Sequence, residues 1–222
     1  MCIRDRLIST FIFTGCSESN EEKEILSIEE LFTLTKDKID TSHSFSFSLM
    51  HKNGYTSLPG GFDISKAQGD IQKPNKLRIN AEIISNNFLI KLSYLSMDNN
   101  YWITNPISFE WVETSQDDNP FKNINPVNIL SDIFSEIENP AIISSQNYDY
   151  EINADINSEN LKSLVGDIIV TNKNVRLSLN INQDGIVDSI KIYGIVQPND
   201  SIDTQREIKF ERWNENLKWE TP

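Results

Sequence analysis

Residues 44–49 read Ser44-Phe45-Ser46-Phe47-Ser48-Leu49 and alternate strictly between polar and apolar side chains. Successive side chains of a β-strand point to opposite faces of the sheet, so this segment predicts a strand with one solvated and one buried face. The same period of two recurs in residues 77–83, 90–94 and 175–181. Strands with one polar face are typical of antiparallel sheets, and a mostly β, α+β protein is therefore predicted.

The segments between these strands carry turn signals. Residues 52–55 contain Asn-Gly, residues 98–100 read Asp-Asn-Asn, and residues 182–185 end in Asp-Gly, all of which favour tight hairpins. Alanine, the strongest helix former, occurs only four times in 222 residues. An antiparallel meander is expected, with few helices.

Three helices are nevertheless predicted. Ser27-Ile28-Glu29-Glu30 forms a capping box, so a helix should begin there and bury a face that includes Leu31 and Ile39. Residues 126–138 combine a proline at the first position with an amphipathic stripe, and Asn139-Pro140 should end that helix. Residues 158–166, with serine first and glycine last, predict a third, shorter helix.

The N-terminus resembles the end of a secretory signal peptide. An apolar run over residues 7–13 leads to Thr14-Gly15-Cys16, a pattern similar to the lipobox of bacterial lipoproteins. We expect residues 1–15 to be a signal peptide that has lost its native start, with residues 1–6 as a sequencing artefact. Cys16 would carry the lipid, and the charged residues 16–26 would form a flexible tether. The alternative is a short buried element with an incidental cysteine.

Composition and missing motifs narrow the function. With 20 Lys and Arg against 33 Asp and Glu, the net charge is −13, which argues against a nucleic-acid partner. His43 and His51 flank one predicted strand without the spacing of a metal or catalytic site, and no phosphate-binding loop or nucleophile motif occurs. No catalytic residue, metal or cofactor is therefore expected. Residues 27–222 are expected to form a single domain.

The apolar surface of the strands and of the helix at 126–138 has two interpretations. The simpler one is an ordinary core in which the helix stripe packs on the sheet. The other is a curved sheet whose concave face, together with the covering helices, leaves space for an acyl chain. The residues alone do not separate these two interpretations.

The order of features resembles the LppX/LprAFG envelope lipoproteins of mycobacteria and related bacteria. The resemblance extends from about residue 31 to the end of the chain, and its motifs are diffuse. It rests on Tyr101-Trp102-Ile103, Trp111-Val112, Asn125-Pro126-Val127-Asn128-Ile129-Leu130, Asn160-Leu161-Lys162-Ser163-Leu164, and the segments 181–187, 190–194 and 220–222.

This resemblance implies a curved antiparallel half-barrel with helices over its concave face, and a monomer anchored through Cys16 on the extracytoplasmic side of a bacterial membrane. An acylated lipid or glycolipid would be bound, and transferred within the cell envelope, between sheet and helices. By analogy the cavity lining is assigned to the strand residues Leu77, Ile79, Leu92 and Tyr94 and to the helix residues Ile129, Ile133, Phe134 and Ile137. The alternative is a structural or interaction lipoprotein with a solid core.

Overall fold

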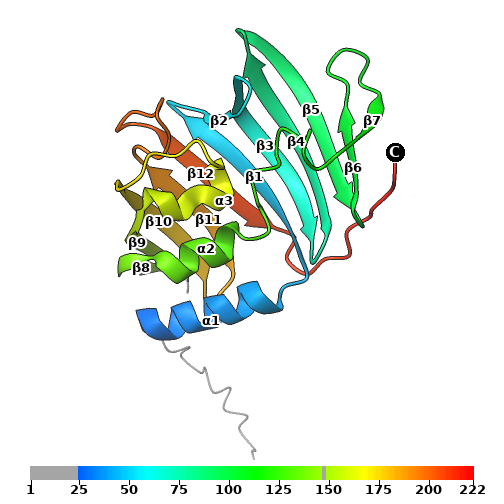
Figure 1. The fold of residues 1–222 in the computed structure, drawn as a ribbon. Coiled ribbons are helices and arrows are strands. Elements are labelled where there is room, and N and C mark those ends of the chain that lie inside the picture. Colours follow the sequence, from blue (N-terminus) through cyan, green and yellow to red (C-terminus); the bar gives the residue numbers. More distant parts are fainter. Residues whose placement is uncertain (1–24, 147–148) are drawn as a thin grey trace, which may run out of the picture.

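One antiparallel sheet organises the chain (Figure 1). The computed structural model describes residues 25–146 and 149–222, and within them twelve strands pair in the order β7-β6-β5-β4-β3-β1-β12-β11-β10-β9-β8, with β2 beside β3. The strands are β1 Ser44–Lys52, β2 Thr56–Leu58, β3 Phe62–Gln72, β4 Lys76–Ser85, β5 Phe88–Met97, β6 Asn100–Thr104, β7 Trp111–Thr114, β8 Glu138–Gln146, β9 Asp149–Asn157, β10 Asn174–Asn182, β11 Val187–Tyr193 and β12 Gln205–Glu211.

The described helices are α1 Ile28–Thr41, α2 Ile129–Glu136 and α3 Lys162–Val165, with a 3-10 turn at Ser158–Leu161 before α3. In Figure 1 they lie over one face of the half of the sheet that runs from β12 to β8. The β3–β7 half is crossed instead by the segment between β7 and α2. Residues 115–128 of this segment are called the strap below. The predicted class, an open antiparallel half-barrel with helices on one face, is confirmed.

Local signals placed the first helix correctly and the second only in part. The Ser27–Glu30 capping box is formed, and α1 begins at Ile28 as predicted. The helix expected over residues 126–138 covers only 129–136, and this correction has a physical reason. Residues 125–128 form a turn in which the Asn128 N–H donates to the Asn125 carbonyl, and Glu138 already belongs to β8.

The third predicted helix is also modified. Residues 158–161 form the 3-10 turn, and the cap is the side chain of Asn157 rather than Ser158, whose hydroxyl donates to the Val170 carbonyl instead. Gly166 ends the element at a φ of 72°, as its position in the sequence predicts.

The polar–apolar alternation did not predict the central strand β3, for two reasons. Its register shifts between Ile64 and Lys66, and this bulge interrupts the period of two. Its inward side chains then become small, at Ala67 and Gly69. A Cβ on Gly69 would lie 2.2 Å from the Arg78 carbonyl oxygen and 2.7 Å from the Phe47 ring, so only glycine fits there.

The main core lies between the helices and the β8–β12 half. Leu31 of α1 and Leu130, Ile133 and Phe134 of α2 are at most 2 % exposed. The rings of Phe32 and Phe134 join the two helices edge to face, with centroids 5.4 Å apart. This half of the molecule is therefore solidly packed.

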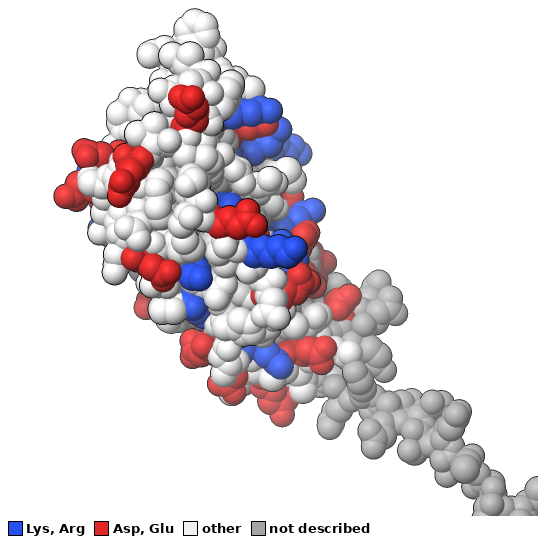
Figure 2. Space-filling view, turned by 90° about the vertical axis from the view of Figure 1, so that its right-hand side faces the viewer, with Lys and Arg blue, Asp and Glu red and all other residues white. Residues whose placement is uncertain are grey.

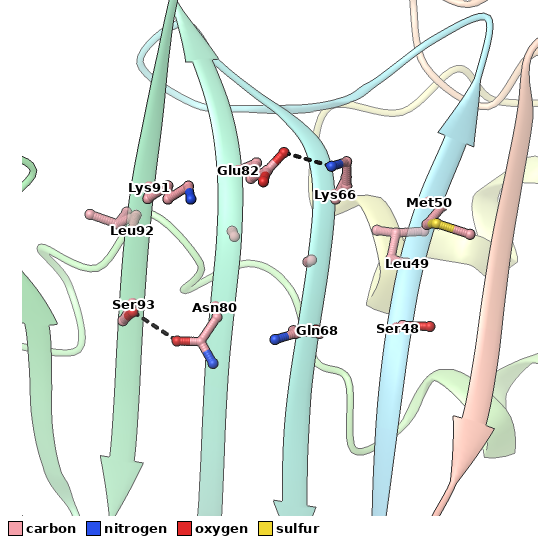
Figure 3. A pocket seen from close by; sticks show the side chains of 12 residues that line it. Ser48, Leu49, Met50, Lys66, Gln68, Asn80, Glu82, Lys91, Leu92 and Ser93 are labelled. Carbon is pink, nitrogen blue, oxygen red and sulfur yellow. Dashed lines mark hydrogen bonds and ion pairs between the residues drawn. The ribbon is translucent and has the colours of Figure 1, made fainter.

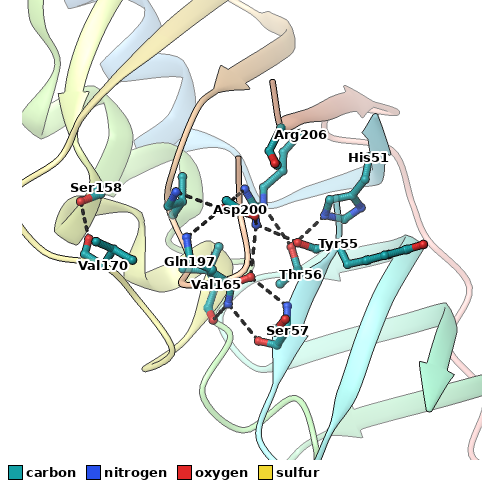
Figure 4. Close-up of polar contacts among 12 residues, drawn as sticks. His51, Tyr55, Thr56, Ser57, Ser158, Val165, Val170, Gln197, Asp200 and Arg206 are labelled. Carbon is teal, nitrogen blue, oxygen red and sulfur yellow. Dashed lines mark hydrogen bonds and ion pairs between the residues drawn. The ribbon is translucent and has the colours of Figure 1, made fainter. Parts of the chain in front are cut away.

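A buried ion pair fastens the β11–β12 loop to this core (Figure 4). Arg206 of β12 is fully buried, and both of its terminal nitrogens lie 2.9 Å from carboxylate oxygens of Asp200. The guanidinium also donates to the Tyr55 carbonyl at 2.7 Å and to Thr56 Oγ1 at 3.3 Å. The same carboxylate accepts the backbone N–H groups of Val196 and Gln197. Both charges are thus fully hydrogen-bonded, as their burial requires.

His51 belongs to the same hydrogen-bonded cluster. Its Nδ1 lies 2.9 Å from the Ser65 carbonyl oxygen and its Nε2 2.9 Å from Thr56 Oγ1. The carbonyl can only accept, so Nδ1 carries the proton and Nε2 accepts from the threonine hydroxyl. Burial lowers the pKa of His51 from 6.5 to about 4, which keeps this ring neutral at pH 7.

Replacing Asp200 should be strongly destabilising. Asp200→Asn leaves the Arg206 charge buried without its counter-charge, and we expect the free energy of unfolding in urea to fall by about 3–5 kcal/mol. The control is Glu82→Gln, which breaks the 2.9 Å pair with Lys66, whose side chain is 61 % exposed. That change should cost less than about 1 kcal/mol. Equal losses in the two variants would contradict the structural role of the buried pair.

His51 should make stability depend on pH. Its pKa is lower in the folded chain than in the unfolded chain, so its contribution is complete above pH 6.5 and is lost as pH falls from 6.5 towards 4. Between pH 7 and pH 4, the wild type should lose about 3 kcal/mol more unfolding free energy than His51→Gln. Urea titrations at several pH values measure this difference, and parallel curves for the two proteins would refute it.

Candidate apolar binding site

A cavity of about 650 Å³ lies under the strap, on the helix-bearing face of the β3–β7 half. This volume is within the range of small-molecule sites. Its strand walls are mostly apolar, and the strap borders it with Asp117, Asp118, Asn119, Pro120 and Lys122 while leaving it partly open to solvent. The remaining lining residues are Pro59, Gly60, Phe62, Ile83, Ile90, Leu92, Ile103, Thr104, Asn105, Pro106 and Val112.

Strand register brings these apolar side chains together. Ile83 of β4 is paired with Ile90 of β5, and Ile103 of β6 with Val112 of β7. Directly paired residues in an antiparallel sheet project to the same face, so four strands contribute to one apolar surface. The alternation that predicts half-buried strands thus also builds the cavity wall.

The strap is held down by Phe121, whose ring lies 5.8 Å from the ring of Tyr94 and is 2 % exposed. The buried Asn119 accepts the Phe121 N–H on its side-chain oxygen at 2.8 Å and fixes the local turn. Beyond Phe121 a second, more polar cavity of about 310 Å³ continues under the strap. The two cavities share Asn119 and Lys122 as lining residues and are called the two compartments under the strap below.

The strand residues that line the larger compartment carry no charge. Its charged lining residues Asp117, Asp118 and Lys122 belong to the strap and are exposed to solvent. Between the two compartments, burial raises the pKa of Tyr94 to about 12, so its hydroxyl stays protonated. An apolar cavity without a buried charge is suited to a hydrocarbon ligand rather than to an ion.

The structure separates the residues predicted to line one cavity. Leu92 lines the apolar compartment, Leu77 and Tyr94 line the second compartment, and Ile79 is buried in register with Tyr94. The helix residues Ile129, Ile133 and Phe134 are buried in the solid core, and Ile137 packs against that core. The strand set and the helix set thus do not meet around the 650 Å³ cavity.

Several lining residues were missed by sequence reasoning. Phe62 lies just before the bulge of β3, and Val112 lies in a strand of only four residues. The strap itself has no periodic pattern. Ile90 and Ile103 could have been assigned to the cavity wall, because they occupy apolar positions of segments that the sequence already indicates as strands.

The opposite face of the same strands is polar. Figure 3 views it with the helices behind the sheet, and the hollow drawn there has a volume of about 440 Å³. Lys66 and Glu82 form an ion pair across it, and Ser93 donates to Asn80 at 2.7 Å. These polar groups satisfy one another, which is typical of a solvated sheet face.

The described residues were also compared with the requirements of a metal site and of a membrane span. Residues 25–146 and 149–222 contain no cluster of histidine, cysteine, aspartate or glutamate suited to a metal ion. None of the helices in these ranges has the length and hydrophobicity of a membrane span. Cys16 and the predicted signal peptide lie outside the described residues.

Comparisons with known proteins point to one fold. No family model matches the sequence, and no curated protein matches it. The crystal structure of LprF from Mycobacterium bovis superimposes with a TM-score of 0.68 at 14 % identity, over 87 % of this chain and 96 % of LprF. That of the Mycobacterium tuberculosis lipoprotein LppX gives 0.57 at 13 % identity, over 86 % of this chain and 99 % of LppX. The resemblance seen in the sequence is therefore confirmed for the fold, and the chain has the LppX/LprAFG half-barrel fold.

Proposed function

We propose that this protein binds an acylated lipid and carries it within the cell envelope. The observation that carries the proposal is the 650 Å³ cavity with uncharged strand walls under the strap. Transfer of apolar surface out of water supplies the binding energy, at about 0.8 kcal/mol for each buried methylene group. The shared fold with LprF and the lipoprotein LppX supports the same function.

The lipid is proposed to lie with its chain along Ile83, Ile90 and Leu92, and its polar part towards the exposed strap residues Asp118 and Lys122. Lining by the α2 residues stays a prediction, because their side chains fill the core beneath the helix. A ligand could reach them only after α2 separated from the sheet.

The alternative is a non-catalytic interaction lipoprotein, which the solid core under α2 favours. In either case we propose a monomeric, non-enzymatic protein, attached through Cys16 to the extracytoplasmic side of a bacterial membrane. No nucleic acid, metal or cofactor takes part in either function.

The lipid proposal predicts that natively purified protein contains an acylated lipid. Mass spectrometry of the organic extract should find it at a reproducible ratio to protein. The delipidated protein should then bind a fluorescent fatty-acyl probe. Absence of lipid together with failure to bind the probe would favour the interaction lipoprotein instead.

Two neighbouring residues of β5 provide a matched pair of variants. Leu92 lines the cavity and Lys91 projects to the polar face, so Leu92→Asn and Lys91→Asn place the same side chain at neighbouring positions of one strand, on opposite faces. An amide facing the bound chain should weaken probe binding about ten-fold in Leu92→Asn. Lys91→Asn should bind like the wild type. Equal affinities in the two variants would place the ligand elsewhere.

The anchor proposal predicts a diacylglyceryl group on Cys16. Mass spectrometry of the N-terminal peptide from membrane-fraction protein should show this adduct and a chain that begins at residue 16. In Cys16→Ser the adduct and the cleavage should both disappear. An unmodified Cys16 in the membrane fraction would contradict the anchor.

A further inference from the structure

Three segments at one end of the sheet contain no charged residue, although charged residues make up 24 % of the chain. They are residues 53–62, 83–90 and 103–109. The strand pairings Asp63 with Ile84 and Ser85 with Phe88 place the β2–β3 and β4–β5 turns together, and the β6–β7 loop lies beside them at the top of Figure 1. On the face seen in Figure 2, the uppermost part of the molecule shows no charged side chain.

Four large apolar side chains project from this end, and we call them the rim. Phe88 and Leu89 begin β5 and are 75 % and 62 % exposed, whereas Ile107 and Phe109 of the β6–β7 loop are 86 % and 65 % exposed. Isolated exposed apolar residues need no explanation, whereas several at one end of a molecule are typical of an interaction surface.

The β6–β7 loop is built to hold its two rim residues outward. The side-chain oxygen of Asn105 accepts the N–H of Ile107 at 2.9 Å and that of Ser108 at 3.2 Å. Phe109 adopts a φ of 60°, a left-handed conformation that is unfavourable for a bulky residue. The loop thus maintains a strained phenylalanine that packs into no core, and such strain is typical of functional positions.

The rim is continuous with the mouth of the apolar cavity. Ile90 follows Phe88 and Leu89 directly, Pro106 precedes Ile107, and both line the cavity. Trp111, which is 37 % exposed, follows Phe109 by two residues. Tryptophan and tyrosine are the residues that favour the headgroup level of a membrane.

We propose that the rim inserts into the surface of a lipid bilayer and opens the cavity onto the membrane. A bilayer is favoured as the partner because the rim and the three segments around it are apolar or uncharged, and because Trp111 follows the rim residue Phe109 closely. In a chain of net charge −13 it is also the part least repelled by lipid phosphates. Docking on the bilayer would bring the cavity to the lipids that it exchanges, so its biological role rests on the proposed function. Docking itself can be measured without a lipid in the cavity.

A site-specific probe tests this. In the full chain with Cys2 and Cys16, its two cysteines, changed to serine, Ser108→Cys labelled with an environment-sensitive fluorophore reports on the rim. Gln68→Cys, exposed on the polar sheet face, is the control position. Phosphatidylcholine vesicles should shift the emission of the label at position 108 to the blue and leave the label at position 68 unchanged. No shift at position 108, or equal shifts at both positions, would overturn the proposal.

Matched variants measure the contribution of the rim. Ile107→Ser should weaken vesicle binding about ten-fold, whereas Ile143→Ser should not change it, since Ile143 is 56 % exposed on β8 at the opposite edge. Phe109→Asn should weaken binding similarly without lowering the melting temperature, because asparagine tolerates a positive φ. A loss of binding that followed a loss of stability would contradict the rim as its cause.

Two further outcomes separate the alternatives. The Leu92→Asn variant, whose cavity is impaired, should still bind vesicles. If the protein binds vesicles but no lipid, the rim proposal is supported and only the lipid-binding function is contradicted. A blue shift that grows with protein concentration in the absence of vesicles would overturn the bilayer as partner and identify a second copy of the chain.

Discussion

The helices cover only part of the apolar face of the sheet. Antiparallel strands with a side-chain period of two give twelve strands one continuous apolar face, and such a face must be shielded from water. Three helices shield the β8–β12 half, and the described part of the chain contains no further α-helix to cover the rest. The β3–β7 half is covered only by an irregular strap, which cannot fill the space as closely as a helix does.

This unequal covering separates the tasks of the two halves. The helix-covered half holds the closely packed core and the buried Arg206–Asp200 pair, which provide a rigid base. The strap-covered half keeps a cavity whose wall is as regular as the core but whose roof is a loop. Loops have fewer packed contacts than helices and open at a smaller energetic cost, so the half with the cavity is also the half suited to admit a ligand.

The sequence predicted the architecture better than the site. Alternation in β1, β4, β5 and β10 and the capping box of α1 are local signals, and each was confirmed. The bulge and Gly69 hid β3, because both depend on a partner strand that local patterns do not contain. The site was harder to predict because Ile133 and Ile90 are chemically alike. The position at which the strap crosses the sheet decides which of the two residues faces the core and which faces the cavity.

An open sheet also has two ends, and an unpaired strand edge is a template for another chain. Here β7 has only four residues, and β8 changes register twice, between Glu138 and Ala141 and between Ile142 and Ser144. Within β8, Asn139 has a φ of 49° and Pro140 has no N–H group to offer. A neighbouring molecule therefore finds no long, regular row of donors and acceptors on either side. Such blunted edges disfavour polymerisation into fibres while leaving the half-barrel open.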